Sequence, residues 1–295
     1  MGLGALSAVG TALYLVIYRV GVQAGGAKIA VLVVLISAAV GSTLAAMMQH
    51  RSVYIFAQSS RSWWLAAVVA VLTLLGNLFA TLALERISAP VTGVFQQTQV
   101  LFVPLLAFFF LRERLSVLFW MGALLSLAGL AVMCMDSGGS TGMNAGGTAL
   151  ATASALCFAI MMVMMKRVAQ EIRPVTFNAT RLWISVLLWF VWQQKLPSAE
   201  DFTPMLVWCA AAAGLVGPVC ARLCLMYSLK HVPAGLATLM GLITPVLSIL
   251  PAYWVFGSYP SNWELAGGAL MTLGIALPVW SNLRRPAEVQ GHASA

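Results

Sequence analysis

An arginine inside a long apolar run is the residue of this sequence that is best placed to do chemistry. Arg222 lies within Ala210–Tyr227, and no acidic residue stands within two helical turns of it. Because an unpaired cation in hydrocarbon costs about 3 kcal/mol or more, we expect Arg222 to face a polar cavity or to have a polar partner. A guanidinium in a cavity would bind a carboxylate or a phosphate. The alternative is structural, with Arg222 capping backbone carbonyls or reaching a membrane interface.

Three amides stand in other apolar runs. Asn77 lies 145 positions before Arg222, a spacing that also relates two similar halves of the chain. Gln96 and Gln99 are three residues apart and share one face of a helix. These amides are predicted to line a water-filled route and to form hydrogen bonds with a solute. The alternative is that they hold neighbouring helices together.

Large apolar and aromatic side chains supply candidates for the rest of a cavity. Tyr14 and Tyr18 lie one helical turn apart, and Met161 and Tyr227 occupy two further apolar runs. Pockets for partly apolar organic solutes are lined by such residues. The alternative is ordinary packing between helices.

Prolines occur inside several apolar runs. Pro104, Pro218 and Pro245 each remove a backbone donor from a predicted helix. The carbonyls that they free can bind a solute or permit bending. We therefore interpret these three residues as candidate gating or helix-break positions.

Titratable residues other than Arg222 argue against several activities. The eight acids and the three histidines are predicted to lie in loops or at span ends, which disfavours a carboxylate-based proton antiport and favours facilitated diffusion. No Walker A or HExxH motif is present, and the five cysteines lack metal-ligand spacing. We expect no catalytic residue, no metal and no cofactor, and we do not expect an enzyme.

Composition assigns the chain to membrane proteins. Hydrophobic residues make up 61% of its 295 residues and charged ones 8%, whereas soluble domains carry about 25% charge. The apolar runs are long and continuous, which indicates helices rather than a barrel. About ten spans are expected, near Leu3–Tyr18 (extending toward Gln23), Ile29–Met48, Trp63–Leu84, Pro90–Leu111, Val117–Met135, Gly146–Met165, Thr176–Trp192, Met205–Ser228, Ala234–Phe256 and Asn262–Leu283.

Residues 83–133 and 228–278 carry the same pattern in one register. Gly122 matches Gly267 and Gly129 matches Gly274. With five spans in each half, the second half enters the membrane from the opposite side, which makes the repeat inverted. The predicted organisation is a first five-helix repeat at 1–137, a second, inverted five-helix repeat at 145–285 and a cytoplasmic tail at 286–295.

The Lys and Arg residues in loops predict the orientation. With a cytoplasmic N-terminus, ten of them fall on the cytoplasmic side and four on the outer side, and both termini lie inside. The remaining two, Arg181 and Arg222, fall within spans, Arg181 near a span end.

The run ERISAPVTGVFQQTQVLFVPLLAFFFLRERLSVLFWMGALLSLAGLAVM resembles the repeat of the drug/metabolite transporter superfamily, EamA type. Its marks are the ISA entry, a proline in the span, the break at Leu111–Ser116 and the GALLSLAGL helix. The second copy, Lys230–Val279, matches less closely and has Ser258 in place of the usual acid. The resemblance covers nearly the whole chain. It implies an all-α polytopic fold with about ten transmembrane helices, as two inverted five-helix repeats around a central cavity. The helices that line this cavity in the family would contain Tyr14, Tyr18, Asn77, Gln96, Gln99, Met161 and Arg222.

The resemblance also implies a function. It is closest to bacterial inner-membrane exporters of amino acids, including aromatic and other apolar ones, which work by alternating access. Arg222 would bind the carboxylate, and the partners would be a small-molecule substrate and the lipid bilayer, without nucleic acid, in a monomer or weak dimer. One alternative is a nucleotide-sugar or phosphorylated-metabolite antiporter, which needs more than one cation in its cavity. Another is a structural or sensor protein of the membrane.

Overall fold

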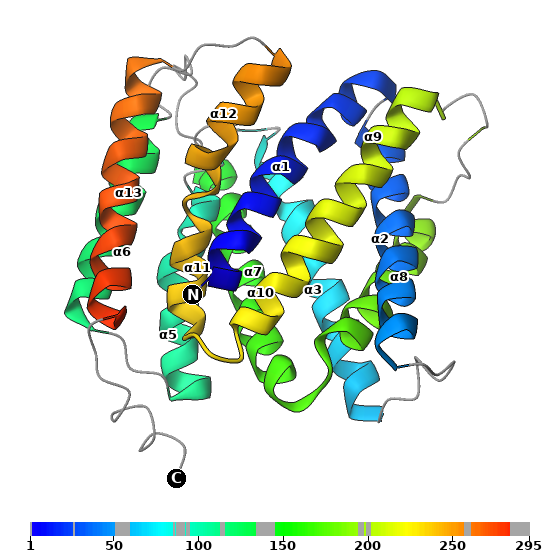
Figure 1. Cartoon of the computed structure of the whole chain (residues 1–295), viewed down its shortest axis with the longest axis horizontal. Helices are drawn as coiled ribbons and strands as arrows, with labels where there is room; N and C mark the ends of the chain where they lie inside the picture. The colour runs from blue at the N-terminus through cyan, green and yellow to red at the C-terminus, as the bar shows by residue number, and fades with distance from the viewer. Residues whose placement is uncertain are drawn as a thin grey trace.

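The computed structural model describes residues 2–25, 27–50, 60–84, 86, 92, 95–112, 116–133, 145–193, 198, 202–256 and 261–283. Every regular element in these residues is a helix (Figure 1). The helices are α1 Gly2–Gly25, α2 Ala27–His50, α3 Ser60–Leu84, α5 Gln99–Leu111, α6 Val117–Met133, α7 Ala145–Glu171, α8 Pro174–Gln193, α9 Pro204–Gly214, the π-helix η2 Leu215–Ala221, α10 Arg222–Ser228, α11 Ala234–Gly241, α12 Thr244–Phe256 and α13 Asn262–Leu283.

The long apolar runs of the sequence form these helices because a helix satisfies all of its backbone polar groups internally. In the described residues, eight helical stretches are long and apolar enough to cross a membrane. Phe95–Leu111 and Val117–Met133 are apolar but shorter. The all-α membrane class is confirmed, whereas the total of ten spans stays a prediction. Residues 113–115 of the break at Leu111–Ser116, residues 134–144 between the two predicted repeats, residues 257–260 around Ser258 and the tail 286–295 lie outside the described residues.

Within the described residues, helices α6 and α13 form the most extensive helix contact, at one edge of the molecule (Figure 1). A Cβ added to Gly122 would overlap the carbonyl oxygen of Gly274, and one added to Gly267 would overlap that of Gly129. This order of contacts makes the pair antiparallel. Small residues allow the two backbones to approach, as in other membrane helix pairs.

A hydrogen bond at the centre of this pair marks the relation between the two halves. The Ser126 hydroxyl shares its hydrogen between the Gly122 carbonyl of its own helix at 2.8 Å and the Met271 carbonyl at 3.2 Å, and Ser126 and Met271 are 145 positions apart. The residue and its own equivalent therefore meet, as they must near a two-fold axis.

The other helix pairs follow the same relation. Helix α2 packs against α8, which is its equivalent in the second half. Helix α3 packs against α7, and the equivalent contact joins α1 to α9, η2 and α10 (Figure 1). The packing thus agrees with two inverted copies of one helical unit. The boundaries proposed for these copies stay a prediction.

Two spans are broken at equivalent positions. Helix α11 ends at Gly241 and α12 begins at Thr244, and Pro245 has no N–H to bond the Gly241 carbonyl. In the first half a turn at Thr98 separates helical residues 95–97 from α5. Thr98 and Ile243, which lies in the second turn, are 145 positions apart.

Pro104 was expected as a candidate helix break, but its helix is not interrupted there. It lies inside α5, which runs without interruption from Gln99 to Leu111. A proline removes one hydrogen bond, here the bond to the Val100 carbonyl, but the bonds on either side remain and sustain the helix. The observed turn, six residues earlier, is stabilised by the Thr98 hydroxyl, which donates to the Phe95 carbonyl at 2.5 Å.

The segments α9, η2 and α10 form one unbroken span from Pro204 to Ser228. Its middle, Leu215–Ala221, is a π-helix that contains Pro218. A π-helix is wider than an α-helix and is frequently found at functional sites. Arg222 follows it directly, so the widened segment sets the direction of the arginine side chain.

Candidate functional site

Arg222 is half-buried at the junction of η2 and α10. Its Nη1 lies 3.9 Å from the Met165 sulfur of α7. A thioether is a weak acceptor, so this contact leaves most of the donor capacity of the guanidinium unused. The acid whose side chain the structure describes, Glu264, is occupied at the start of α13, where it accepts from the Ser261 amide at 2.9 Å. No carboxylate within the described residues forms an ion pair with Arg222.

Tyr14 of α1, which stacks on Tyr18, interacts with Arg222. The rings of Tyr14 and Tyr18 are 5.5 Å apart with an interplanar angle of 19°. The Tyr14 ring lies against η2 at Gly217, where a Cβ would come within 2.6 Å of the ring. The interaction of Tyr14 with Arg222 is electrostatic. The absence of a side chain at Gly217 therefore brings an aromatic face next to the cation.

A second arginine lies behind the π-helix. Arg181 of α8 is 4% exposed, and its Nη2 donates to Asn178 Oδ1 at 3.0 Å. The Asn178 amide donates in turn to the Ser42 hydroxyl and to the Pro218 carbonyl, both at 2.9 Å. The Arg181 Nε has no hydrogen-bond partner. A buried donor in that state costs about 1–3 kcal/mol.

The two arginines are close enough to repel each other electrostatically. Arg181 is the eighth residue of the 20-residue α8, so its sequence placement near a span end is corrected. The site therefore carries two positive charges. The sequence signal that points to the second one is the pair Asn178 and Arg181, three residues apart on one face of an apolar helix.

Gln96 and Gln99 form their hydrogen bonds with residues other than Arg222. Gln96 Nε2 donates to the Ser154 hydroxyl of α7 at 3.2 Å, and Ser154 donates to the Gly76 carbonyl of α3 at 2.8 Å. Gln99 Nε2 donates to Gln97 Oε1 at 3.3 Å. The glutamines are half-buried and belong to the region where α5, α7 and α3 meet.

Asn77 and Met161 belong to the contact between α3 and α7. Asn77 is exposed, and its Nδ2 donates to the Thr73 carbonyl of its own helix at 2.8 Å. The Thr73 hydroxyl donates to the Val69 carbonyl at 2.7 Å and lies 3.2 Å from the Met161 sulfur. Met161 is 3% exposed, so its present role is packing.

Tyr227 and the prolines occupy other positions around the site. The Tyr227 ring carries the Lys230 ammonium 5.5 Å from its centre and packs near Ala46 and Val175, close to one end of α10. Pro218 provides the carbonyl that Asn178 binds. The Pro245 carbonyl accepts from the Ser248 hydroxyl at 2.7 Å at the start of α12.

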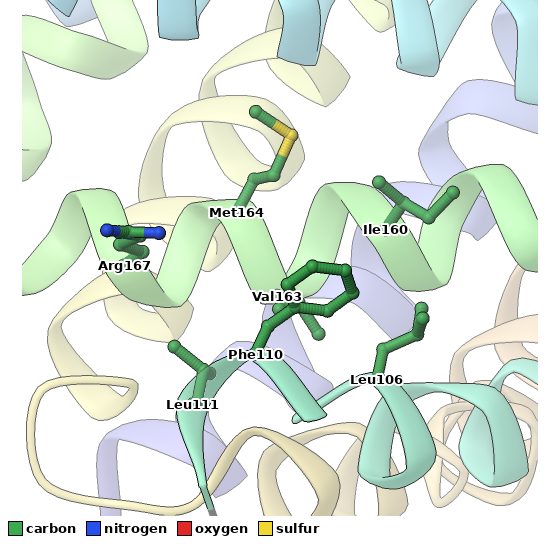
Figure 2. Close-up of a pocket in the computed structure, with 7 residues that line it drawn as sticks. All are labelled: Leu106, Phe110, Leu111, Ile160, Val163, Met164 and Arg167. Atoms are coloured by element: carbon green, nitrogen blue, oxygen red, sulfur yellow. The ribbon is translucent and has the colours of Figure 1, made fainter. Parts of the chain in front are cut away.

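A cavity of about 230 Å³ lies between α5 and α7 (Figure 2). Six of its lining residues are apolar, and the guanidinium of Arg167 lies at one end (Figure 2). The lining residues are Leu106, Phe110, Leu111, Ile160, Val163, Met164 and Arg167. None of the predicted site residues is among them, so this cavity is separate from the arginine site.

The comparison with protein families decides the class. The EamA-like transporter family matches residues 1–135 and matches again at residues 145–280. The chain belongs to the EamA-like transporter family. A double match means that each half of this transporter is one copy of the family's unit, in agreement with the paired helices of the fold.

Individual relatives of this EamA-like transporter are distant. A protein of Synechocystis sp. named as an uncharacterized transporter is 24% identical over 249 residues, which are 78% of this chain and 69% of the relative. A crystal structure with 21% identity covers 95% of this chain and 99% of its own, with a TM-score of 0.77. This second likeness shows the fold.

The EamA-like transporter is therefore a multi-pass membrane protein with two arginines inside its apolar helices. Arg222 begins α10 where η2 and α10 pack against α1 with its stacked tyrosines, and Arg181 lies on α8, which also contacts α10. Such an arrangement can bind a small molecule that has an acid group and a flat or apolar part.

Proposed function

We propose that this transporter exports amino acids by alternating access, with Arg222 as the residue that binds the substrate carboxylate. The observation that carries the proposal is the state of the Arg222 guanidinium. It is half-buried beside the Tyr14 ring, and its hydrogen-bond contact is a single thioether sulfur. A carboxylate would replace that weak contact with paired, charge-assisted hydrogen bonds.

The neighbouring residues complete the proposed site. The stacked rings of Tyr14 and Tyr18 offer a flat surface to an aromatic or other apolar side chain. The amides of Gln96, Gln99 and Asn77 would form hydrogen bonds with the solute, in exchange for those they now make with protein groups. The proposed substrate range is broad and includes aromatic amino acids and related metabolites.

The proposed cycle uses the irregular parts of the helices. The turn at Leu242 and Ile243, the π-helix and the turn at Thr98 are the places where hydrogen bonding within the spans changes. We assign them the bending that opens the site to one side and then to the other. Transport would follow the substrate gradient, because the titratable residues supply no evident proton relay.

The setting of this function is also part of the proposal. The protein would lie in a bacterial inner membrane with both termini in the cytoplasm, as a monomer or weak dimer. Its partners would be the amino acid and the bilayer, without nucleic acid, and it would catalyse no reaction.

Transport by purified protein in liposomes tests the proposal. Labelled amino acids are exchanged in a counterflow assay, for the unaltered chain and for Arg222→Ala. We expect Arg222→Ala to abolish exchange, and Arg173→Ala to retain it because Arg173 lies in the connection between α7 and α8. Near-normal exchange by a monodisperse Arg222→Ala protein would remove Arg222 from the site.

A further inference from the structure

We propose that Arg181 is a second specificity charge, which makes the Arg222 site favour solutes that carry two acid groups and a net negative charge. This inference rests on the proposed function and narrows its substrate class. It assigns Arg181 an electrostatic role, while Arg222 makes the direct contact with the solute.

The burial of Arg181 is the first support. The residue is 4% exposed in the middle of an apolar helix, and its Nε has no hydrogen-bond partner. One neutral side chain, Asn178, accepts from its Nη2. A cation in such surroundings is costly unless it has a function or a counter-charge. The described residues supply no counter-charge.

The path from Arg181 to the site is the second support. Asn178 binds Arg181 through its oxygen and the Pro218 carbonyl through its nitrogen. Pro218 lies in the π-helix four residues before Arg222. Ser42 of α2 fixes the same amide from another side, because the hydroxyl accepts the other hydrogen of the Asn178 amide nitrogen. The Arg181 charge is thus held at a set position behind η2.

The sum of charges gives the substrate class. A zwitterion with one carboxylate and one ammonium would leave two guanidinium charges without compensation. A solute with a second acid group would reduce that imbalance. Because charges act over longer distances in a medium of low dielectric constant than in water, Arg181 need not touch the solute to affect its binding. A dicarboxylic amino acid has the required charge, and so does a phosphate monoester.

Matched solutes test the inference in the unaltered protein. Glutamate and glutamine have nearly the same shape and differ by one negative charge, as do aspartate and asparagine. Each competes with a labelled amino acid in the liposome counterflow assay. We expect the acid to compete about tenfold or more better than its amide, since Arg181 attracts the additional negative charge through a medium of low dielectric constant.

Variants of Arg181 then test whether the preference for acids depends on this residue. We expect Arg181→Gln to reduce the preference about tenfold while glutamine still exchanges, and Arg181→Lys to keep most of it. Arg173→Gln, an arginine variant outside the site, should leave the preference unchanged. Equal competition by glutamate and glutamine in the unaltered protein overturns the inference, and so does a preference that survives Arg181→Gln. The first comparison needs no variant, so a failure of Arg181→Gln to fold leaves the inference falsifiable.

The outcomes separate this inference from the proposed function. If amino acids are exchanged without a preference for acids, the proposed transport function stands and the specificity role of Arg181 is overturned. If no amino acid is exchanged, the proposed amino-acid transport is wrong. The liposome exchange of glycerol phosphate is then compared with that of glycerol. A phosphate preference that depends on Arg181 would then support the second charge alone, and its absence would overturn both.

Discussion

Two helix contacts of this transporter are related by the internal repeat, and they join equivalent helices through different side chains. In one, α1 packs against η2 and α10, and in the other, α7 packs against α3. The first has Arg222 beside the Tyr14 ring, which lies against Gly217. The equivalents of these three residues in the second contact are Asn77, Ala159 and Leu72. The cation is thus replaced by an amide, and the large and small residues are exchanged.

The different side chains at the two contacts show how a protein built from two similar halves can have a site that is not symmetric. Symmetry fixes where the helices lie, because the same small residues and apolar runs occur in both copies. An amino acid has a charged end and a side chain, and a symmetric site would treat both ends alike. The residues that break the symmetry are therefore those expected to orient the substrate.

The largest effect should come from making the two contacts chemically alike. Arg222→Asn gives the first contact the residue that the second has at Asn77. We expect exchange to fall about 100-fold, because a buried charge-assisted contact is worth 2–5 kcal/mol. Counterflow in liposomes measures it. Retention of more than a third of the exchange rate would mean that the cation is not what distinguishes the two contacts.

The second effect comes from exchanging the large and small residues. Gly217→Leu should lower the free energy of unfolding by about 2 kcal/mol or more, because the new side chain would overlap the Tyr14 ring. Adding Tyr14→Ala reproduces the pair Ala159 and Leu72, and should restore much of the stability without restoring exchange. Thermal unfolding in detergent gives the first quantity and counterflow the second. No rescue by the double variant would show that the two contacts are not interchangeable as packing units.

A smaller effect on transport is expected for Gln96, which is bonded to Ser154 of α7 in the second of the two contacts. Gln96→Leu removes the hydrogen bond to Ser154 and one proposed solute contact. We expect a loss in apparent affinity of about threefold to tenfold, since a neutral hydrogen bond is worth about 1 kcal/mol. The concentration dependence of counterflow measures it. A loss as large as that of Arg222→Asn would make Gln96 as important for binding as the cation.

The smallest effect concerns the contact between equivalent helices, where no difference in chemistry is proposed. Ser126→Ala removes the hydroxyl that donates to the Met271 carbonyl. The expected cost is about 0.6 kcal/mol in the free energy of unfolding, with an unchanged exchange rate. Thermal unfolding and counterflow together check this, and a selective loss of exchange would make this contact part of the transport cycle.

Span positions followed from the sequence closely, and their exceptions have physical reasons. The predicted span Val117–Met135 is helix Val117–Met133 in the described residues. The predicted end at Met165 was too early, because α7 continues to Glu171. Lys166 suggested a span end, but it is 6% exposed and donates to the Val232 carbonyl at 2.7 Å. A distant backbone acceptor thus allows a lysine inside the packed helix, and no local pattern could have revealed it.

Some features of the candidate site could be predicted from the sequence, and others required the structure. Arg222 is visible in the sequence, because a cation in an apolar run is costly and therefore conspicuous. Which residues lie near Arg222 is not visible, since Tyr14 and Arg181 are separated from it by 208 and 41 positions along the chain. Met161 and Tyr227 satisfied the same sequence criteria as Tyr14, yet in the structure they pack elsewhere.

By itself the sequence determined the membrane class, the helices and their duplication, because these depend on the length and spacing of apolar runs. Only the tertiary structure decided that two arginines share one site and that Gly217 admits the Tyr14 ring. The physical reason is that burial and electrostatic interactions depend on distances between helices. Those distances are set by packing around the two-fold relation, and the order of residues along the chain does not contain them.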